Sequence, residues 1–472
     1  MIGEVSMEIK LKFLGATKCV TGSSHLLTVN DKKILLDCGL FQSNDLKSYS
    51  NDILNVDPKE IDYIVLSHSH VDHSGRIPLF FKLGFQGKVI CTEPTKELCG
   101  YLLKDAARIQ QEETYFENLS RHGKGVKALS PLYDEEDVEL ALKNFYTYGY
   151  NEEILLEEGI KVTFRDAGHI LGSAICEILI KNCGESWIKL IYTGDIGNIN
   201  RDILNNPEKE LQGDFLILES TYGDKMHEEK DNYAKLLEIV KDIMEGDGNL
   251  IIPCFSLGRT QEIIYMLNSF IESGQVQGCN VYIDSPLAAG ITKIFRKYEE
   301  YFDKKAKALI EKGDDPLNFK GLHFVENGDD GEKVYEVKSK SIIIVAGGVY
   351  DGGRIANHLK NNLPRPECGV LITSYQGNQS IGNKLLKGNK RIKLQGENIE
   401  VKGKVYYMNG LSGHADKAGL YNWVSSMKEK PKKIFLVHGE GKNIESFTNK
   451  LKSENYSVVI PNFLDEFPLE IN

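Results

Sequence analysis

The chain has 472 residues, of which 41% are hydrophobic and 26% are charged, and these proportions are ordinary for a globular protein. Its formal net charge of −11 argues against a protein that coats nucleic acid with a wholly basic surface. No apolar run is long enough for a membrane helix and the nine cysteines form no CxxC pair, so we expect a protein of the reducing cytoplasm without membrane association.

Strand signals dominate the first half of the chain. Apolar runs and alternation predict strands at 8–14, 24–29, 33–38 and 61–66, with a hairpin about Asn30. Helical spacing follows at 94–111 and 135–143. Four more strands are predicted at 160–167, 174–180, 187–192 and 215–218.

The second half repeats the pattern. Strands are predicted at 249–252, 281–283, 341–345 and 370–373, separated by helical stretches such as 259–270, and residues 327–332 are expected to form an exposed loop. Strands at 404–408 and 433–437 complete the series. This alternation of strands and helices indicates an α/β protein, and the length predicts two or three domains or one domain with an insertion.

A histidine-rich motif, HSHVDH at 68–73, directly follows the predicted strand at 61–66. The chain contains only 11 histidines, so three within six positions indicate a site. Imidazole and carboxylate are ligands for zinc and the first-row transition metals. Four such residues exceed the three that a catalytic zinc usually takes from protein. The motif therefore predicts two metals, with His68 and His70 on one and Asp72 and His73 on the other.

Three more candidate ligands follow other predicted strands. His169 lies between two strands, Asp195 follows the strand that ends at Tyr192, and His438 follows the last strand. Flanking glycines allow close backbone approach at each position. Each residue alone would more often be a turn residue or a core histidine, but their shared position favours ligation. The Asp195 carboxylate is of a type that bridges two cations roughly 3.5–4 Å apart.

These motifs together resemble the metallo-β-lactamase superfamily, whose hallmark is HxHxDH followed by a later His, Asp and His. The chain is further similar to the β-CASP branch of nucleic-acid hydrolases, above all to the cleavage endonuclease of the polyadenylation machinery and its bacterial and archaeal RNase relatives. The branch-like motifs lie at 21–25, 219–223, 253–259, 284–288, 352–354, 374–377, 412–416 and 438–440. The resemblance implies a metallo-β-lactamase αββα sandwich at 7–220 and 395–472, with an α/β β-CASP domain inserted at 221–394 as a cap.

The resemblance also implies two groups of metal ligands that share one carboxylate. The groups are His68, His70 and His169 for one Zn²⁺, Asp72, His73 and His438 for the other, and Asp195 as the bridge. Asp37 would orient ligands without binding metal. This ligand set also accepts Mn²⁺.

The implied catalytic residues are His414, Asp72 and Glu219. Glu219, His414 and His438 match motifs A, B and C of the branch, and a histidine at motif C accompanies the RNA-directed members. The two metals would activate a hydroxide, and Asp72 would accept a proton from the water. His414 would protonate the leaving oxygen while Glu219 positions it. The products would carry a 5′-phosphate and a 3′-hydroxyl.

Arg259, Arg354 and Ser374 are the expected substrate-binding residues. The two arginines follow glycines in presumed loops, where they would bind RNA phosphates or, as an equally open alternative, make structural ion pairs. The expected function is zinc-dependent hydrolysis of single-stranded RNA, mainly endonucleolytic, with hydrolysis from the 5′ end as a second mode, in a homodimer by family analogy. The alternatives are a small-substrate hydrolase of the thioesterase or lactonase type and a non-catalytic RNA-binding scaffold.

Overall fold

The computed structural model describes residues 8–42, 45, 48–122, 127–182, 186–199, 201–227, 231–326, 328–349, 352–374, 376–377, 380–408 and 410–470. The chain divides into two compact units. The first consists of residues 1–200, 206–226 and 414–472, and the second of residues 201–205 and 227–413.

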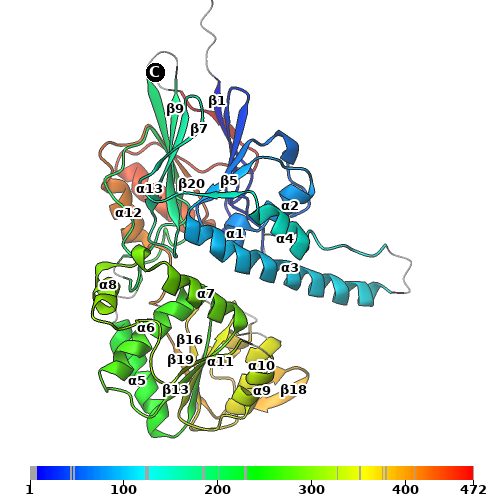
Figure 1. Ribbon diagram of the computed structural model, residues 1–472, viewed down its shortest axis with the longest axis vertical. Helices are drawn as coiled ribbons and strands as arrows, with labels where there is room; N and C mark the ends of the chain where they lie inside the picture. The colour runs from blue at the N-terminus through cyan, green and yellow to red at the C-terminus, as the bar shows by residue number, and fades with distance from the viewer. Residues whose placement is uncertain are drawn as a thin grey trace, which may run out of the picture. The chain divides into compact units, whose positions relative to one another are not determined.

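The first unit is built on two seven-stranded sheets (Figure 1). The first sheet has the strand order β22 (Glu466–Pro468), β1 (Ile9–Phe13), β2 (His25–Val29), β3 (Lys32–Leu36), β4 (Tyr63–Val65), β5 (Lys88–Cys91) and β6 (Phe145–Thr147). The second sheet has the order β21 (Val458–Val459), β20 (Lys433–Val437), β11 (Phe215–Glu219), β10 (Trp187–Tyr192), β9 (Ala174–Lys181), β8 (Ile160–Asp166) and β7 (Glu153–Glu157).

The two sheets share one apolar core, and helices cover their outer faces. Leu11 and Leu27 of the first sheet pack in the same buried cluster as Val162 and Ile178 of the second. A separate cluster joins the first sheet to three helices, and another joins the second sheet to two. The helices of this unit are α1 (Val71–Ser74), α2 (Ile77–Lys82), α3 (Glu93–Arg121), α4 (Glu135–Leu142), α12 (Lys417–Ser425) and α13 (Gly441–Ser453). This order of layers confirms the predicted αββα sandwich.

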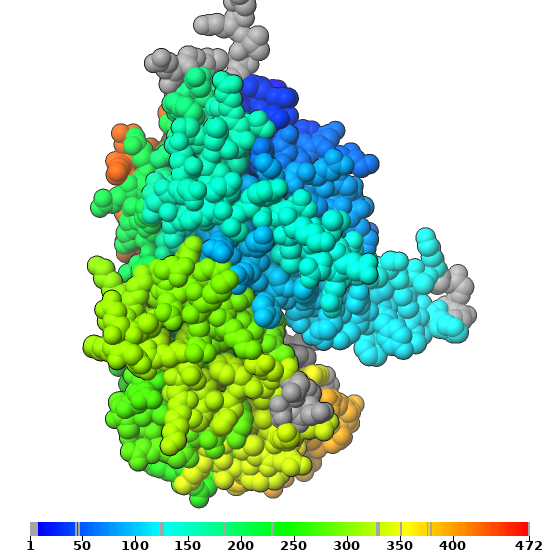
Figure 2. Space-filling model, viewed as in Figure 1, coloured from blue at the N-terminus to red at the C-terminus, as the bar shows by residue number. Residues whose placement is uncertain are grey.

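Helix α3 is ten residues longer at its C-terminus than the predicted 94–111 segment. Its N-cap is Thr92, whose hydroxyl accepts a hydrogen bond from the Thr95 amide, and the helix buries side chains only as far as Ala107. Beyond that point its large apolar side chains, Ile109, Tyr115, Phe116 and Leu119, are exposed. Figure 2 shows the C-terminal part of this helix, in cyan, standing clear of the rest of the first unit.

The second unit contains a six-stranded, entirely parallel sheet. Its order is β14 (Leu322–Phe324), β13 (Asn280–Asp284), β15 (Ser341–Ala346), β12 (Asn249–Cys254), β16 (Gly369–Ile372) and β19 (Lys404–Tyr407). The hairpin is β17 (Arg391–Leu394) and β18 (Glu397–Glu400), and the helices are α5 (Asn232–Glu245), α6 (Arg259–Glu272), α7 (Pro286–Lys297), α8 (Lys304–Glu311), α9 (Gly328–Tyr335), α10 (Gly353–Asn362) and α11 (Ile381–Leu386). Because all six strands are parallel, the loops that follow them gather at one edge of the sheet.

Two segments of the second unit differ from the expectation. Strand β19 pairs in parallel with β16, so residues 395–413 lie in the second unit although the expected boundary was residue 394. The segment expected to be a loop at 327–332 is helical from residue 328 in α9, and residue 327 lies outside the described part. The buried Val334 anchors this helix in an apolar cluster with the sheet, which outweighs the glycines and aspartates that predicted a loop.

The eight cysteines within the described ranges are all free and buried. Burial raises the pKa of the Cys38 and Cys99 thiols to about 12, so these side chains behave as small neutral hydrophobes. No helix in the same ranges is both long enough and apolar enough to cross a bilayer.

Candidate metal centre and active site

The HSHVDH motif is placed by the end of β4 and the start of α1. Strand β4 ends at Val65, and the chain then turns through His68 to His70, which is the N-cap of α1. The first turn of that helix carries Asp72 and His73. The turn after a buried strand and the short helix that follows it therefore hold four donor side chains within six residues.

The remaining donors come from the second sheet. His169 lies in the connection between β8 and β9, and Asp195 follows β10. Glu219 is the last residue of β11, and His438 follows β20. Because β10, β11 and β20 are adjacent and parallel, their carboxyl ends deliver Asp195, Glu219 and His438 to the same edge. His438 takes a left-handed backbone conformation, with φ of 48°, which is uncommon outside glycine and indicates a locally constrained residue.

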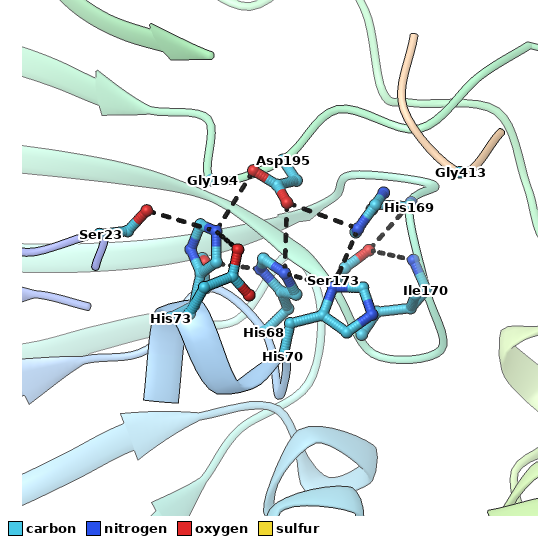
Figure 3. Close-up of polar contacts among 12 residues, drawn as sticks. Ser23, His68, His70, His73, His169, Ile170, Ser173, Gly194, Asp195 and Gly413 are labelled. Atoms are coloured by element: carbon cyan, nitrogen blue, oxygen red, sulfur yellow. Dashed lines mark hydrogen bonds and ion pairs between the residues drawn. The ribbon is translucent and has the colours of Figure 1, made fainter. Parts of the chain in front are cut away.

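The first predicted ligand group is assembled closely (Figure 3). His70 Nδ1 lies 3.1 Å from His68 Nε2 and 3.2 Å from His169 Nε2. Asp195 Oδ2 lies 3.5 Å from both His68 Nε2 and His169 Nε2. Burial is the main cause that lowers the pKa of His70 to about 4, and a neutral imidazole is the form that binds metal.

The second predicted group lies on the other side of Asp195. Asp72 Oδ2 is 3.4 Å from His438 Nε2 and 3.9 Å from His73 Nε2. Asp195 Oδ1 is 3.3 Å from His73 Nε2 and 3.6 Å from His438 Nδ1. The two oxygens of one carboxylate therefore face the two ligand groups separately.

The donors fit divalent cations. Three imidazole nitrogens, from His68, His70 and His169, lie within reach of one another and of an Asp195 carboxylate oxygen. Asp195 Oδ1 is buried and has no hydrogen bond of normal geometry. A buried carboxylate oxygen in that state is costly unless a cation meets it. Histidine and aspartate are also the ligand types of catalytic divalent metals.

Outer partners orient the histidine rings. His73 Nδ1 lies 2.6 Å from Asp37 Oδ2, which leaves Nε2 to face Asp195. His438 Nδ1 lies 2.9 Å from the Thr221 hydroxyl, which leaves Nε2 toward Asp72. Such partners fix which nitrogen is available to a metal. Asp37 was expected to have this role, whereas Thr221 was not singled out because a threonine after a strand carries no ligand signal.

His414 and Glu219 form a pair next to the metal ligands. His414 Nδ1 lies 3.1 Å from Glu219 Oε1 and 3.9 Å from Asp195 Oδ2. Glu219 is fully buried and also accepts hydrogen bonds from the amides of Ile196 and Thr221, so its carboxylate is held in place. Burial alone would lower the pKa of His414, but the carboxylates of Glu219 and Asp195 raise it to about 10.

The two arginines expected to bind substrate both make contacts within the second unit. Arg259 donates from Nη1 to the Thr373 carbonyl at 2.5 Å, and its Nε lies 3.7 Å from Glu262 Oε2. Arg354, at the start of α10, is ion-paired with the buried Asp284. Both arginines therefore make the structural contacts that were the alternative to RNA binding. Their contact with RNA stays a prediction.

Ser374, the third expected substrate-binding residue, follows β16 at the carboxyl edge of the parallel sheet. Its hydroxyl accepts a hydrogen bond from Gln376 Nε2 at 3.1 Å. The neighbouring Tyr375 lies outside the described residues. The structure thus places Ser374 beside Thr373, the residue whose carbonyl holds Arg259.

Three family models match successive parts of the chain. A metallo-β-lactamase superfamily model matches residues 17–149, a β-CASP domain model matches 260–385, and a model of the Zn-dependent metallo-hydrolase RNA specificity domain matches 398–461. An RNase J-like protein of Methanocaldococcus jannaschii is 31% identical over 92% of this chain and 93% of its own length. The chain belongs to the β-CASP ribonuclease family.

Other members of the β-CASP ribonuclease family are similar over nearly the whole chain. A ribonuclease of Thermus thermophilus is 29% identical, with 96% of this chain and 99% of that protein covered. The transcription termination factor FttA of Methanocaldococcus jannaschii is 30% identical, with 94% and 69% covered. A crystal structure of a protein of unknown function from Enterococcus faecalis shares the fold at a TM-score of 0.58 and 13% identity, with 98% and 100% covered. As a β-CASP family member, the protein is a metal-dependent hydrolase.

Proposed function

We propose that the protein is a zinc-dependent ribonuclease that hydrolyses phosphodiester bonds of single-stranded RNA in the cytoplasm. Endonucleolytic cleavage is the main mode, and hydrolysis from the 5′ end is the second. Membership of the β-CASP ribonuclease family supports RNA as the substrate over the small substrates of thioesterases or lactonases. Every expected ligand position carries a histidine or an aspartate, which supports an enzyme over a non-catalytic scaffold.

The observation that carries the proposal is the two-sided environment of Asp195. Its Oδ2 faces His68 and His169, and its Oδ1 faces His73 and His438. One carboxylate between two donor groups suits a pair of catalytic metals. His68, His70 and His169 would hold one Zn²⁺, Asp72, His73 and His438 the other, and Asp195 both. Mn²⁺ suits the same ligands.

When bound, two such ions supply positive charge against a phosphate and lower the pKa of a water toward 7. Asp72 would take up the proton of that water. His414 would contact the scissile phosphate and deliver a proton to the leaving oxygen, and Glu219, which lies 3.1 Å from its Nδ1, would orient the ring. The products would keep the phosphate at the 5′ end.

In the second unit, Arg259, Arg354 and Ser374 would contact the RNA backbone. The guanidinium groups are pre-oriented by the Thr373 carbonyl and by Asp284, and oriented guanidinium groups bind phosphate well. A homodimer is part of the proposal by family analogy.

Cleavage of a circular single-stranded RNA tests the function, because a circle has no ends for an exonuclease. Purified protein with Zn²⁺ or Mn²⁺ is compared with the His414→Ala and Asp72→Ala variants, and the metal content of each is measured. We expect the wild type to linearise the circle, and His414→Ala to cleave about 10²–10⁴-fold more slowly with its metal retained. Asp72→Ala should lose both cleavage and metal.

The exposed His323 of the second unit gives a matched control, since His323→Ala should leave cleavage and metal content unchanged. An intact circle beside a degraded linear RNA would reduce the proposal to an exonuclease. If neither RNA were cut with either metal, the ribonuclease proposal would be wrong.

A further inference from the structure

One phenylalanine of the second unit is exposed where the parallel sheet ends. Phe255 directly follows β12, which lies inside the sheet between β15 and β16. Its side chain is 62% exposed, whereas Phe270 and Phe295 of the same unit are buried. Loops at the carboxyl ends of parallel strands are where α/β sheets usually bind ligands, so an exposed apolar ring at this position points to a contact.

The backbone around Phe255 is fixed by hydrogen bonds. The Thr260 hydroxyl donates to the Phe255 carbonyl at 2.8 Å, and Gln261 Nε2 donates to the Ser256 carbonyl at 3.1 Å. On the other side, the Gly347 amide donates to the Cys254 carbonyl at 2.8 Å. The ring is therefore presented by an ordered loop, which lowers the entropy cost of binding.

Glycines follow both strands that flank β12. The strand beside β12 on one side, β15, is followed by Gly347 and Gly348, and the segment after β16 on the other side includes Gly377. A Cβ atom added at Gly348 or at Gly377 would meet nothing within 4 Å. Among the described residues, these two glycines therefore leave open space beside their own backbone at the carboxyl edge of the sheet.

The chemistry of the neighbourhood indicates what this group is. Arg259 begins the helix that follows the Phe255 loop, and the Thr373 carbonyl and Glu262 hold its guanidinium. Proteins that bind single-stranded nucleic acid combine aromatic rings, on which bases stack, with cationic side chains that bind phosphates. We propose that Phe255 stacks on one base of the RNA, without preference for its identity, and so holds the strand on the second unit. This inference rests on the proposed ribonuclease function.

Base stacking is tested with a single-stranded RNA that carries one 2-aminopurine, whose fluorescence falls when the base stacks. The 2-aminopurine is moved along the RNA, and binding is measured in a His414→Ala background so that the strand stays intact. We expect quenching at one position, and Phe255→Ala should remove it and weaken binding roughly 5- to 150-fold. Phe255→Trp should restore both signals, whereas Phe255→Leu, which has no π face, should not.

Phe116 on α3 is a matched control, because its side chain is 66% exposed and belongs to the first unit. Phe116→Ala should bind RNA like its parent. An RNA with an abasic nucleotide at the quenched position should bind Phe255→Ala and its parent equally. Thermal unfolding checks that Phe255→Ala is folded, as expected for an exposed side chain.

The outcomes separate this inference from the proposed function. If wild-type protein cuts RNA while Phe255→Ala binds it as tightly as the parent does, stacking is wrong and the ribonuclease stands. In that case Phe255 would serve a protein contact instead. If the wild type does not cut RNA and the His414→Ala parent does not bind it, both proposals fail.

Discussion

Asp37 is the clearest place to test how the metal centre is held. It is fully buried, and its Oδ2 accepts hydrogen bonds of 2.6 Å from the Ser67 and Tyr192 hydroxyls and lies 2.6 Å from His73 Nδ1. Its Oδ1 accepts the Ser67 amide at 2.7 Å. One carboxylate thus serves four donors from three different segments.

The cost of Asp37→Ala follows from these donors. The Ser67 hydroxyl can turn to His68 Nδ1, 3.0 Å away, but the Ser67 amide, Tyr192 OH and His73 Nδ1 lose their acceptor. A buried donor without a partner costs about 1–3 kcal/mol, so the three together cost about 3–9 kcal/mol. Water entering the space would favour the lower end of this range. Loss of such an orienting partner also lowers metal affinity about 10- to 100-fold.

Scanning calorimetry of EDTA-treated protein measures the stability part, and titration with Zn²⁺ measures affinity. A loss of about 3 kcal/mol lowers the melting temperature of a unit of this size by about 6–12 °C, and only the transition of the first unit should move. Ser67→Ala, which removes one contact of Asp37 and leaves the carboxylate in place, should have a smaller effect. A shift of Asp37→Ala below about 2 °C with unchanged affinity would refute the reasoning.

Three further outcomes are expected. Removal of metal with a chelator should abolish RNA cleavage, and Zn²⁺ or Mn²⁺ should restore it, as followed on a labelled strand. Gly39→Ala should lose bound metal and melt earlier, because the added Cβ would lie 1.6 Å from the Asp72 carbonyl oxygen, and metal analysis with calorimetry checks this. Asp284→Ala should destabilise the second unit by about 3–5 kcal/mol, because its partners Arg354 and His358 are then left without a carboxylate; calorimetry should show this with normal metal content.

The strands that carry the candidate site were predictable because each is a buried apolar run that ends in a distinctive residue. The observed strand Ile160–Asp166 differs from its predicted range by one residue. Three-residue strands such as β6 and β14 were not predicted, because three positions are too few to reveal an alternating apolar pattern. The second-unit boundary was also misplaced, because the pairing of β19 with β16 depends on contacts that leave no local signal.

The donor residues were predictable by chemical type, and their division into two groups matches the distances about Asp195, although metal binding itself stays a prediction. Their supporting partners were not predictable. Tyr192 reaches Asp37 across 155 residues of sequence, and nothing distinguishes it from any other strand tyrosine. Ordinary residues acquire such roles only when the fold brings them together.

The sequence separation within the metal centre also affects when activity can arise. Asp72 and His438 face each other across 366 residues, and the whole of the second unit is made between them. At synthesis rates of about 5–20 residues per second, the nascent chain waits roughly 20–70 s between the two donors. For most of that interval the chain also lacks His414, and β20 is made only just before His438, so the candidate donors cannot come together before β20 has been synthesised.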